Sequence, residues 1–100
     1  MGLQKLEQRW LAHQSKPFPS GYRSKRIAGT NLTLLQADLG ACIMAACQTG
    51  GALGPRLKQT FESSLKILRQ VVNELEGEPQ AHFREMQALA EELAKNLPRT

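Results

Sequence analysis

The sequence predicts an all-α fold, a small up-and-down helical bundle with three main helices, a short N-terminal helix and an irregular basic arm. Apolar residues recur at helical spacing in four segments, and no segment alternates as a strand would. Aromatic residues make up only 5% of the chain, so the core must consist largely of Leu and Ala, which suits packed helices. One hundred residues fit a single domain, with helix and arm in residues 1–30 and the bundle in residues 31–98.

The first predicted helix has one apolar face, formed by Leu3, Leu6, Trp10 and Leu11. It ends before Pro17, and residues 15–30 follow with two prolines, two glycines and no helical period. Connections of this length tend to be functional or loosely ordered. Residues 1–26 hold six basic residues against one acidic residue, a net charge of +5, whereas the seven basic and eight acidic residues that remain give −1. The positive charge therefore belongs to the N-terminal helix and the arm.

The second predicted helix, residues 32–47, contains a single charge, Asp38. Thr30 or Asn31 can cap its start, and the pair Gly50–Gly51 ends it. Both of its faces are apolar, one with Leu32, Leu35, Leu39, Cys42, Ile43 and Ala46, the other with Leu34, Ala37, Ala41, Met44 and Ala45. We therefore expect a central helix that is covered on nearly every side.

The third predicted helix begins at Gly54–Pro55 and ends at Gly77. Its apolar seam consists of Leu57, Phe61, Leu65, Leu68, Val72 and Leu75. The fourth helix begins at Pro79 and is closed by Pro98. Because only about three residues separate these two helices, we expect them to be antiparallel neighbours.

Asp38 is the first candidate site residue, because a carboxylate on an apolar helix must be paired, hydrogen-bonded or neutralised. In one interpretation it is an anchor or an acid–base group in a cleft. In the other it pairs with Arg23, Arg26, Tyr22 or the Trp10 indole and pins the arm to the helix. Replacement of Asp38 by Ala would then break a buried charge pair and lower the free energy of unfolding by about 3–5 kcal/mol.

The arm offers a second candidate site, because residues 16–26 mix cations with aromatic rings: Lys16, Arg23, Lys25 and Arg26 with Phe18 and Tyr22. Such a mixture can hold phosphates while an aromatic ring stacks on a base. The other possible partner is the acidic surface of the last two helices, in the same or a neighbouring subunit: Glu74, Glu76, Glu78, Glu85, Glu91 and Glu92. One basic stretch without a recognised fold is a weak signal for nucleic acid, so the acidic surface is favoured.

No motif predicts catalysis, a cofactor or a metal. Glu78, His82 and Glu85 lie on adjacent helical turns, but bundles that hold metals supply ligands from several helices, and His13 lies on the distant first helix. The two cysteines lack the spacing of redox or zinc motifs. The glycines before the third helix lack the Lys-Ser/Thr of a phosphate-binding loop. We therefore expect a protein that is not an enzyme and holds no cofactor or metal.

For function, the first hypothesis is a non-enzymatic interaction module in the cytoplasm that engages a protein partner. The apolar surface of the second and third helices exceeds what a three-helix core needs, so we also expect a homodimer. No segment has the length and composition of a membrane span or a signal region. The alternative is a nucleic-acid-binding accessory protein that uses residues 16–26, and an enzyme built on Asp38 ranks lowest.

Overall fold

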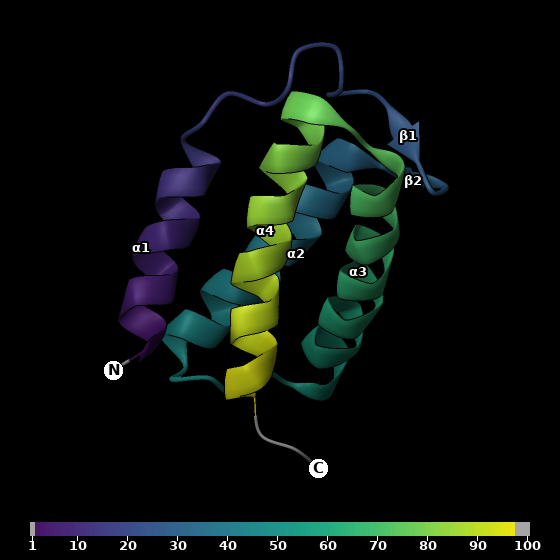
Figure 1. Cartoon of the computed structure of the whole chain (residues 1–100). Coiled ribbons are helices and arrows are strands. Elements are labelled where there is room, and N and C mark those ends of the chain that lie inside the picture. The colour runs from purple at the N-terminus through teal and green to yellow at the C-terminus, as the bar shows by residue number, and fades with distance from the viewer. Residues whose placement is uncertain (1, 98–100) are drawn as a thin grey trace.

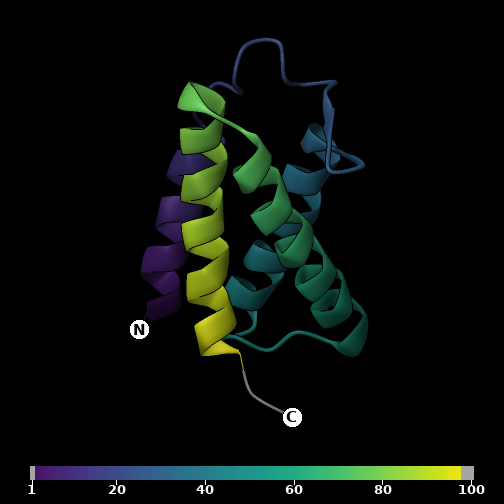
Figure 2. The ribbon, with the colours of Figure 1, turned by 45° about the vertical axis from the view of Figure 1, so that its right-hand side comes forward.

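The computed structural model describes residues 2–97, which form four helices (Figure 1). Their bounds are Gly2–Gln14 for α1, Leu32–Gln48 for α2, Pro55–Glu74 for α3 and Gly77–Asn96 for α4. The short strands β1 (Arg26–Ile27) and β2 (Thr30–Asn31) lie between α1 and α2. Successive helices run in opposite directions, and α1 and α3 each pack against both α2 and α4 (Figure 2). The predicted all-α up-and-down bundle is confirmed, with α1 as its fourth member. Met1 and Pro98, the predicted end of the last helix, lie outside the described residues.

The ends of α2 follow the capping signals in the sequence. The Leu34 backbone N–H donates to the Asn31 side chain (3.0 Å), which satisfies a free donor in the first turn. Gly50 and Gly51 end the helix with φ values of 70° and 103°, a region that side chains rarely adopt. The N–H of Gly51 donates back to the carbonyl of Ala46 (2.7 Å). Both predicted ends of α2 are therefore confirmed.

The link between α3 and α4 differs from the prediction. The third helix ends at Glu74 instead of Gly77, and the fourth begins at Gly77 instead of Pro79. The physical reason is Leu75, which leaves the helix with an extended backbone and places its side chain, 5% exposed, in the core. Pro79 lies in the first turn of α4, where its missing N–H removes no intrahelical hydrogen bond.

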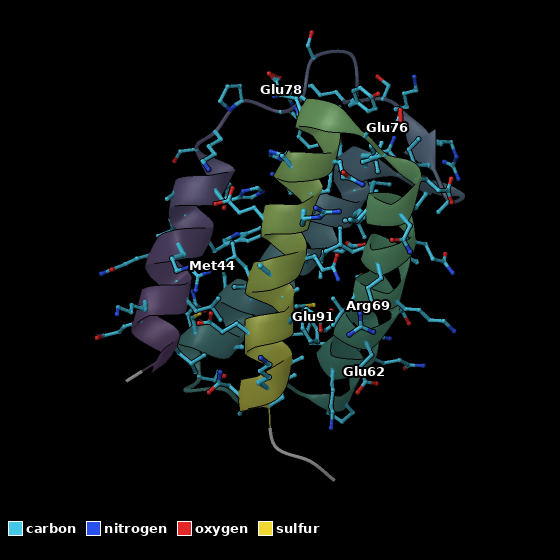
Figure 3. The ribbon with its side chains drawn as sticks, viewed as in Figure 1. Met44, Glu62, Arg69, Glu76, Glu78 and Glu91 are labelled. Atoms are coloured by element: carbon cyan, nitrogen blue, oxygen red, sulfur yellow. The ribbon has the colours of Figure 1, made fainter. Side chains whose placement is uncertain are left out.

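The core lies between the four helices. The inner face of α2 is the one predicted, and its buried residues are Leu32, Leu35, Leu39, Cys42, Ile43 and Ala46. The predicted seam of α3 is also buried at Phe61, Leu65, Leu68, Val72 and Leu75. At the surface, the Arg69 guanidinium donates two hydrogen bonds (2.8 and 2.7 Å) to the Glu91 carboxylate and joins α3 to α4 (Figure 3).

The expectation that α2 is covered on nearly every side is wrong. Leu34 is 62% exposed, and Ala37 and Ala41 are exposed as well. In a bundle where each helix packs mainly against two neighbours, every helix keeps an outer face, and that of α2 happens to be apolar. We call Leu34, Ala37, Ala41, Met44 and Ala45 the outer face of α2.

The strands β1 and β2 are an element that the sequence did not predict. They form an antiparallel hairpin that pairs Arg26 with Asn31 and Ile27 with Thr30. The two turn residues between the strands, Ala28 and Gly29, have φ values of 53° and 76°, as a two-residue type I′ turn requires. Strands of two residues are too short to show alternation, and Ala is an uncommon residue at the first turn position.

Gly40 allows close packing of α1 against α2. A Cβ atom at this position would lie 2.9 Å from Cζ2 of Trp10, whose side chain is 1% exposed and therefore confined. Real Cβ atoms do not approach other atoms so closely, and the ring would have to move.

We predict that Gly40→Ala lowers the free energy of unfolding by about 1–2 kcal/mol, because the clash with Trp10 outweighs the better helix propensity of Ala. Urea denaturation measures the change. In a Trp10→Leu background the clash is absent, and the same substitution should then stabilise the protein by up to about 1 kcal/mol. Equal effects of Gly40→Ala in both backgrounds would contradict this account.

Candidate functional site

The arm follows a defined path over one end of the bundle, drawn at the top of Figure 1. Two of its turns are closed by backbone hydrogen bonds, from the Tyr22 N–H to Pro19 (3.1 Å) and from the Lys25 N–H to Tyr22 (3.2 Å). Phe18 and Tyr22 are half-buried against the core, whereas Arg23 is exposed. The aromatic side chains thus anchor the arm and its cations face outward.

Beneath the arm lies a polar cluster that joins α1 to α4. His13 is fully buried, its Nδ1 donates to the Glu85 carboxylate (3.0 Å), and its Nε2 has no hydrogen-bond partner among the described residues. Its ring centroid lies 4.3 Å from that of His82 and 5.7 Å from that of Trp10. The Lys16 ammonium donates to the same Glu85 oxygen (2.8 Å). One carboxylate therefore holds both the end of α1 and the start of the arm.

The electrostatics of this cluster keep His82 neutral. Burial is the main cause that lowers the pKa of His82 to about 4. Positive charge on His13 or Lys16 also lowers this pKa, whereas the negative charge of Glu85 raises it. Hydrogen bonds from Lys16 and His13 lower the pKa of Glu85. The Nε2 of His82 lies 3.1 Å from the Oε1 of Gln36, which links α4 to α2. The cluster is suited to holding α1, the arm, α4 and α2 together, because its groups contact one another.

A groove of about 500 Å³ runs between α1 and α2 beside the arm. We call it the α1–α2 groove, and its lining is Trp10, Gln14, Lys16, Phe18, Arg23, Thr33, Gln36, Ala37, Gly40, Ala41 and Met44. About half of the lining is aromatic or apolar, the polar side chains add amides and a hydroxyl, and the two cations come from the arm. The groove therefore continues the outer face of α2 toward the arm.

A second hollow of about 490 Å³ lies on the other side of Phe18, between the arm and α4. Glu78, His82 and Glu85 line it together with Lys16. Glu85 is already paired with Lys16 and His13, and no residue of α2 lines this hollow, whereas the α1–α2 groove adjoins the outer face of α2. We therefore take the α1–α2 groove as the candidate functional site.

Four of the predicted site residues line this groove: Trp10 from α1, and Lys16, Phe18 and Arg23 from the arm. Tyr22 lies beneath the Lys25 ammonium, which is 5.1 Å from the ring centroid. The Arg26 guanidinium donates to the Gly29 carbonyl (2.8 Å) within the hairpin. The predicted contact between the arm and the acidic last helix occurs at Lys16 and Glu85.

Asp38 is exposed, so the expectation of a buried carboxylate that pins the arm is wrong. Among residues 2–97 its side chain forms no hydrogen bond or ion pair, and the expected pairing with Arg23, Arg26, Tyr22 or Trp10 is not found. Asp38 lies on the side of α2 that borders Cys42, where burial and then its charge raise the pKa of the Cys42 thiol. A role for Asp38 in contacting a partner stays a prediction.

Sequence reasoning missed the burial of His13 and its contact with Glu85. The sequence suggests that His13 lies far from α4, whereas its ring packs against His82. A signal was present, because His13 follows Leu3, Leu6 and Trp10 at intervals of 3, 4 and 3 and so extends the buried stripe of α1. The antiparallel pairing of α1 with α4, which brings the histidines together, had no local signal.

Comparison with family models, with curated proteins and with solved structures gave no significant match. In the part of the chain that the structure describes, no three His, Cys, Asp or Glu side chains are grouped to hold a metal ion. None of the described helices is both long and apolar enough to cross a membrane. The functional argument therefore rests on the α1–α2 groove and the outer face of α2.

We predict that Asp38→Ala changes the free energy of unfolding by less than about 0.5 kcal/mol, because the side chain is exposed and its loss breaks no contact. Thermal or urea denaturation of the two proteins provides the measurement. A loss near the 3–5 kcal/mol expected for a broken buried pair would show instead that Asp38 is paired in solution.

We predict that the protein loses stability as the pH falls from about 6.5 to about 4. The unfolded chain protonates His82 near its ordinary pKa of 6.5, whereas the folded chain resists protonation down to a pKa of about 4. The loss should be about 1–2 kcal/mol, since each pKa unit is worth about 1.4 kcal/mol and partial exposure of the ring reduces the effect.

Melting temperatures of the wild type and His82→Gln over this pH range test the assignment. The variant should show a flatter profile between pH 6.5 and 4. Glu85 acts in a lower window, because a carboxylate with a lowered pKa loses its stabilising contribution only as the pH falls through that value. An unchanged profile in His82→Gln would rule out His82 as the source.

Proposed function

We propose that this chain is a non-enzymatic protein–protein interaction module that docks its partner on the α1–α2 groove and the outer face of α2. The observation that carries the proposal is the apolar outer face, where Leu34 is 62% exposed beside exposed Ala37 and Ala41. Single exposed apolar residues are ordinary, but a contiguous apolar face beside a groove is typical of an interaction site.

The arm supports a protein partner better than a nucleic acid. A ring that stacks on a base must offer a free face, yet the Arg23 guanidinium lies 5.7 Å from the Phe18 centroid and Lys25 covers Tyr22. Phe18 also packs edge-on against Phe83, with centroids 5.6 Å apart. Binding of nucleic acid through residues 16–26 therefore remains the alternative function, supported by the charge of the arm alone.

The homodimer and the cytoplasmic location expected from the sequence stay predictions. A second copy would dock on the outer face of α2, where Leu34 is exposed. Light scattering coupled to gel filtration at micromolar concentration distinguishes a monomer of 11.1 kDa from a dimer of about twice that mass.

We predict that a photo-crosslinking amino acid in place of Ala41 gives a discrete protein adduct in the cell that makes this protein, because this position faces the docked partner. The matched control is the same substitution at Gln70, an exposed position on α3. Adding Met44→Glu should remove the adduct from position 41, since a charge in the groove opposes apolar docking.

The size and composition of the adduct separate the alternatives. A nuclease-sensitive adduct would favour the nucleic-acid function, and an increment of 11.1 kDa would identify a second copy. Absence of any adduct at position 41, or equal adducts at positions 41 and 70, would contradict docking on the outer face of α2.

A further inference from the structure

The α1–α2 groove carries positive charge at one end only. Lys16 and Arg23 line that end, and no acidic side chain lines the groove. Lys16 is neutralised by Glu85 at 2.8 Å, whereas the Arg23 guanidinium pairs with no carboxylate among residues 2–97. Phe18 lies under the Arg23 guanidinium and supports it. The groove therefore presents one cation, Arg23, that packs on an aromatic ring, has no carboxylate partner among residues 2–97 and lies beside an apolar floor.

The floor of the groove suits the backbone of a helix. Ala37, Gly40 and Ala41 keep side chains on this part of α2 short, and Trp10 lies directly beneath Gly40. Small residues let a second helix approach closely, and Met44 provides a larger apolar contact at the end away from the arm. A helix laid in a groove between two helices is a common mode of peptide recognition.

We propose that the α1–α2 groove receives an amphipathic helix of a partner protein, with small apolar residues on its inner face and a carboxylate at the end that meets Arg23. The inference rests on the proposed interaction function and names the chemistry of its partner. An arginine guanidinium binds a carboxylate through two parallel hydrogen bonds, which fixes the direction of the docked helix as well as adding affinity.

Charge favours this partner over a second copy of the chain. Each copy has a net charge of +4, and a second copy would add its own basic arm. Like charges on two approaching surfaces slow association and lower its specificity, whereas an acidic helix is attracted to the basic end of the groove. Of the two cations that line the groove, Arg23 is the one without a carboxylate partner among residues 2–97, and an acidic partner pairs with it.

The test is a selection from a library of displayed 16-residue helical peptides, randomised in charge and in apolar pattern, against the whole chain. Selected peptides should carry small apolar residues four positions apart and Asp or Glu toward one end. Fluorescence anisotropy then measures the dissociation constant of one such labelled peptide. Arg23→Gln should weaken binding about fivefold, the effect of losing one exposed charge pair.

Two further variants make the result specific. Arg26→Gln removes the same charge from the arm but outside the groove, where Arg26 bonds to Gly29, and should leave binding unchanged. Ala41→Gln narrows the floor on an exposed helical position and should weaken binding at least tenfold. Circular dichroism checks that every variant retains its helical content.

The failures are distinguishable. Neutral or basic selected peptides, or equal affinity for wild type and Arg23→Gln, would overturn the acidic partner, while a loss with Ala41→Gln would keep the groove as a docking site. Absence of enrichment, or no effect of Ala41→Gln, would overturn both this inference and the proposed function. A free chain that is already a dimer, and that acidic peptides fail to dissociate, would assign the groove to a second copy.

Discussion

The partly buried contact between His13 and Glu85 is the interaction on which the rest of this bundle depends. The carboxylate lies 3.0 Å from the imidazole Nδ1 and 2.8 Å from the Lys16 ammonium, so it holds the C-terminal end of α1 and the start of the arm against α4. With α1 held there, Trp10 packs under Gly40 and sets the spacing of α1 and α2. The width of the α1–α2 groove is thus a consequence of a polar contact on its far side.

Local features of the fold could be predicted from the sequence because they depend on residues close along the chain. The cap at Asn31, the glycines after α2 and the apolar stripes of α2 and α3 all belong to this class. The residue at which α3 ends could not be predicted, because the helix ends before Gly77 only through the burial of Leu75 in the core. The bundle was predictable, and its exact boundaries depended on tertiary packing.

The candidate site was less predictable, because it depends on contacts between distant segments. An apolar helical face looks the same in sequence whether it is covered by the same chain or left open for a partner, and for that reason α2 was expected to be central. The expected burial of Asp38 followed from that error. His13 shows the converse, a polar residue that continues an apolar stripe and is buried because Glu85 meets it from another helix.

Comparison of the outer faces of the helices shows that folding alone does not explain the composition of α2. The outer face of α3 is charged and polar, with Glu62, Lys66 and Gln70 exposed, and the helix packs well through its inner seam. The inner face of α2 is equally complete, so polar residues on its outer side would leave the core intact. Its outer face instead exposes Leu34 and two alanines and adjoins an arginine without a carboxylate partner among the described residues. The core does not require these exposed apolar residues, and they are therefore the physical basis for proposing that the outer face of α2 binds a partner.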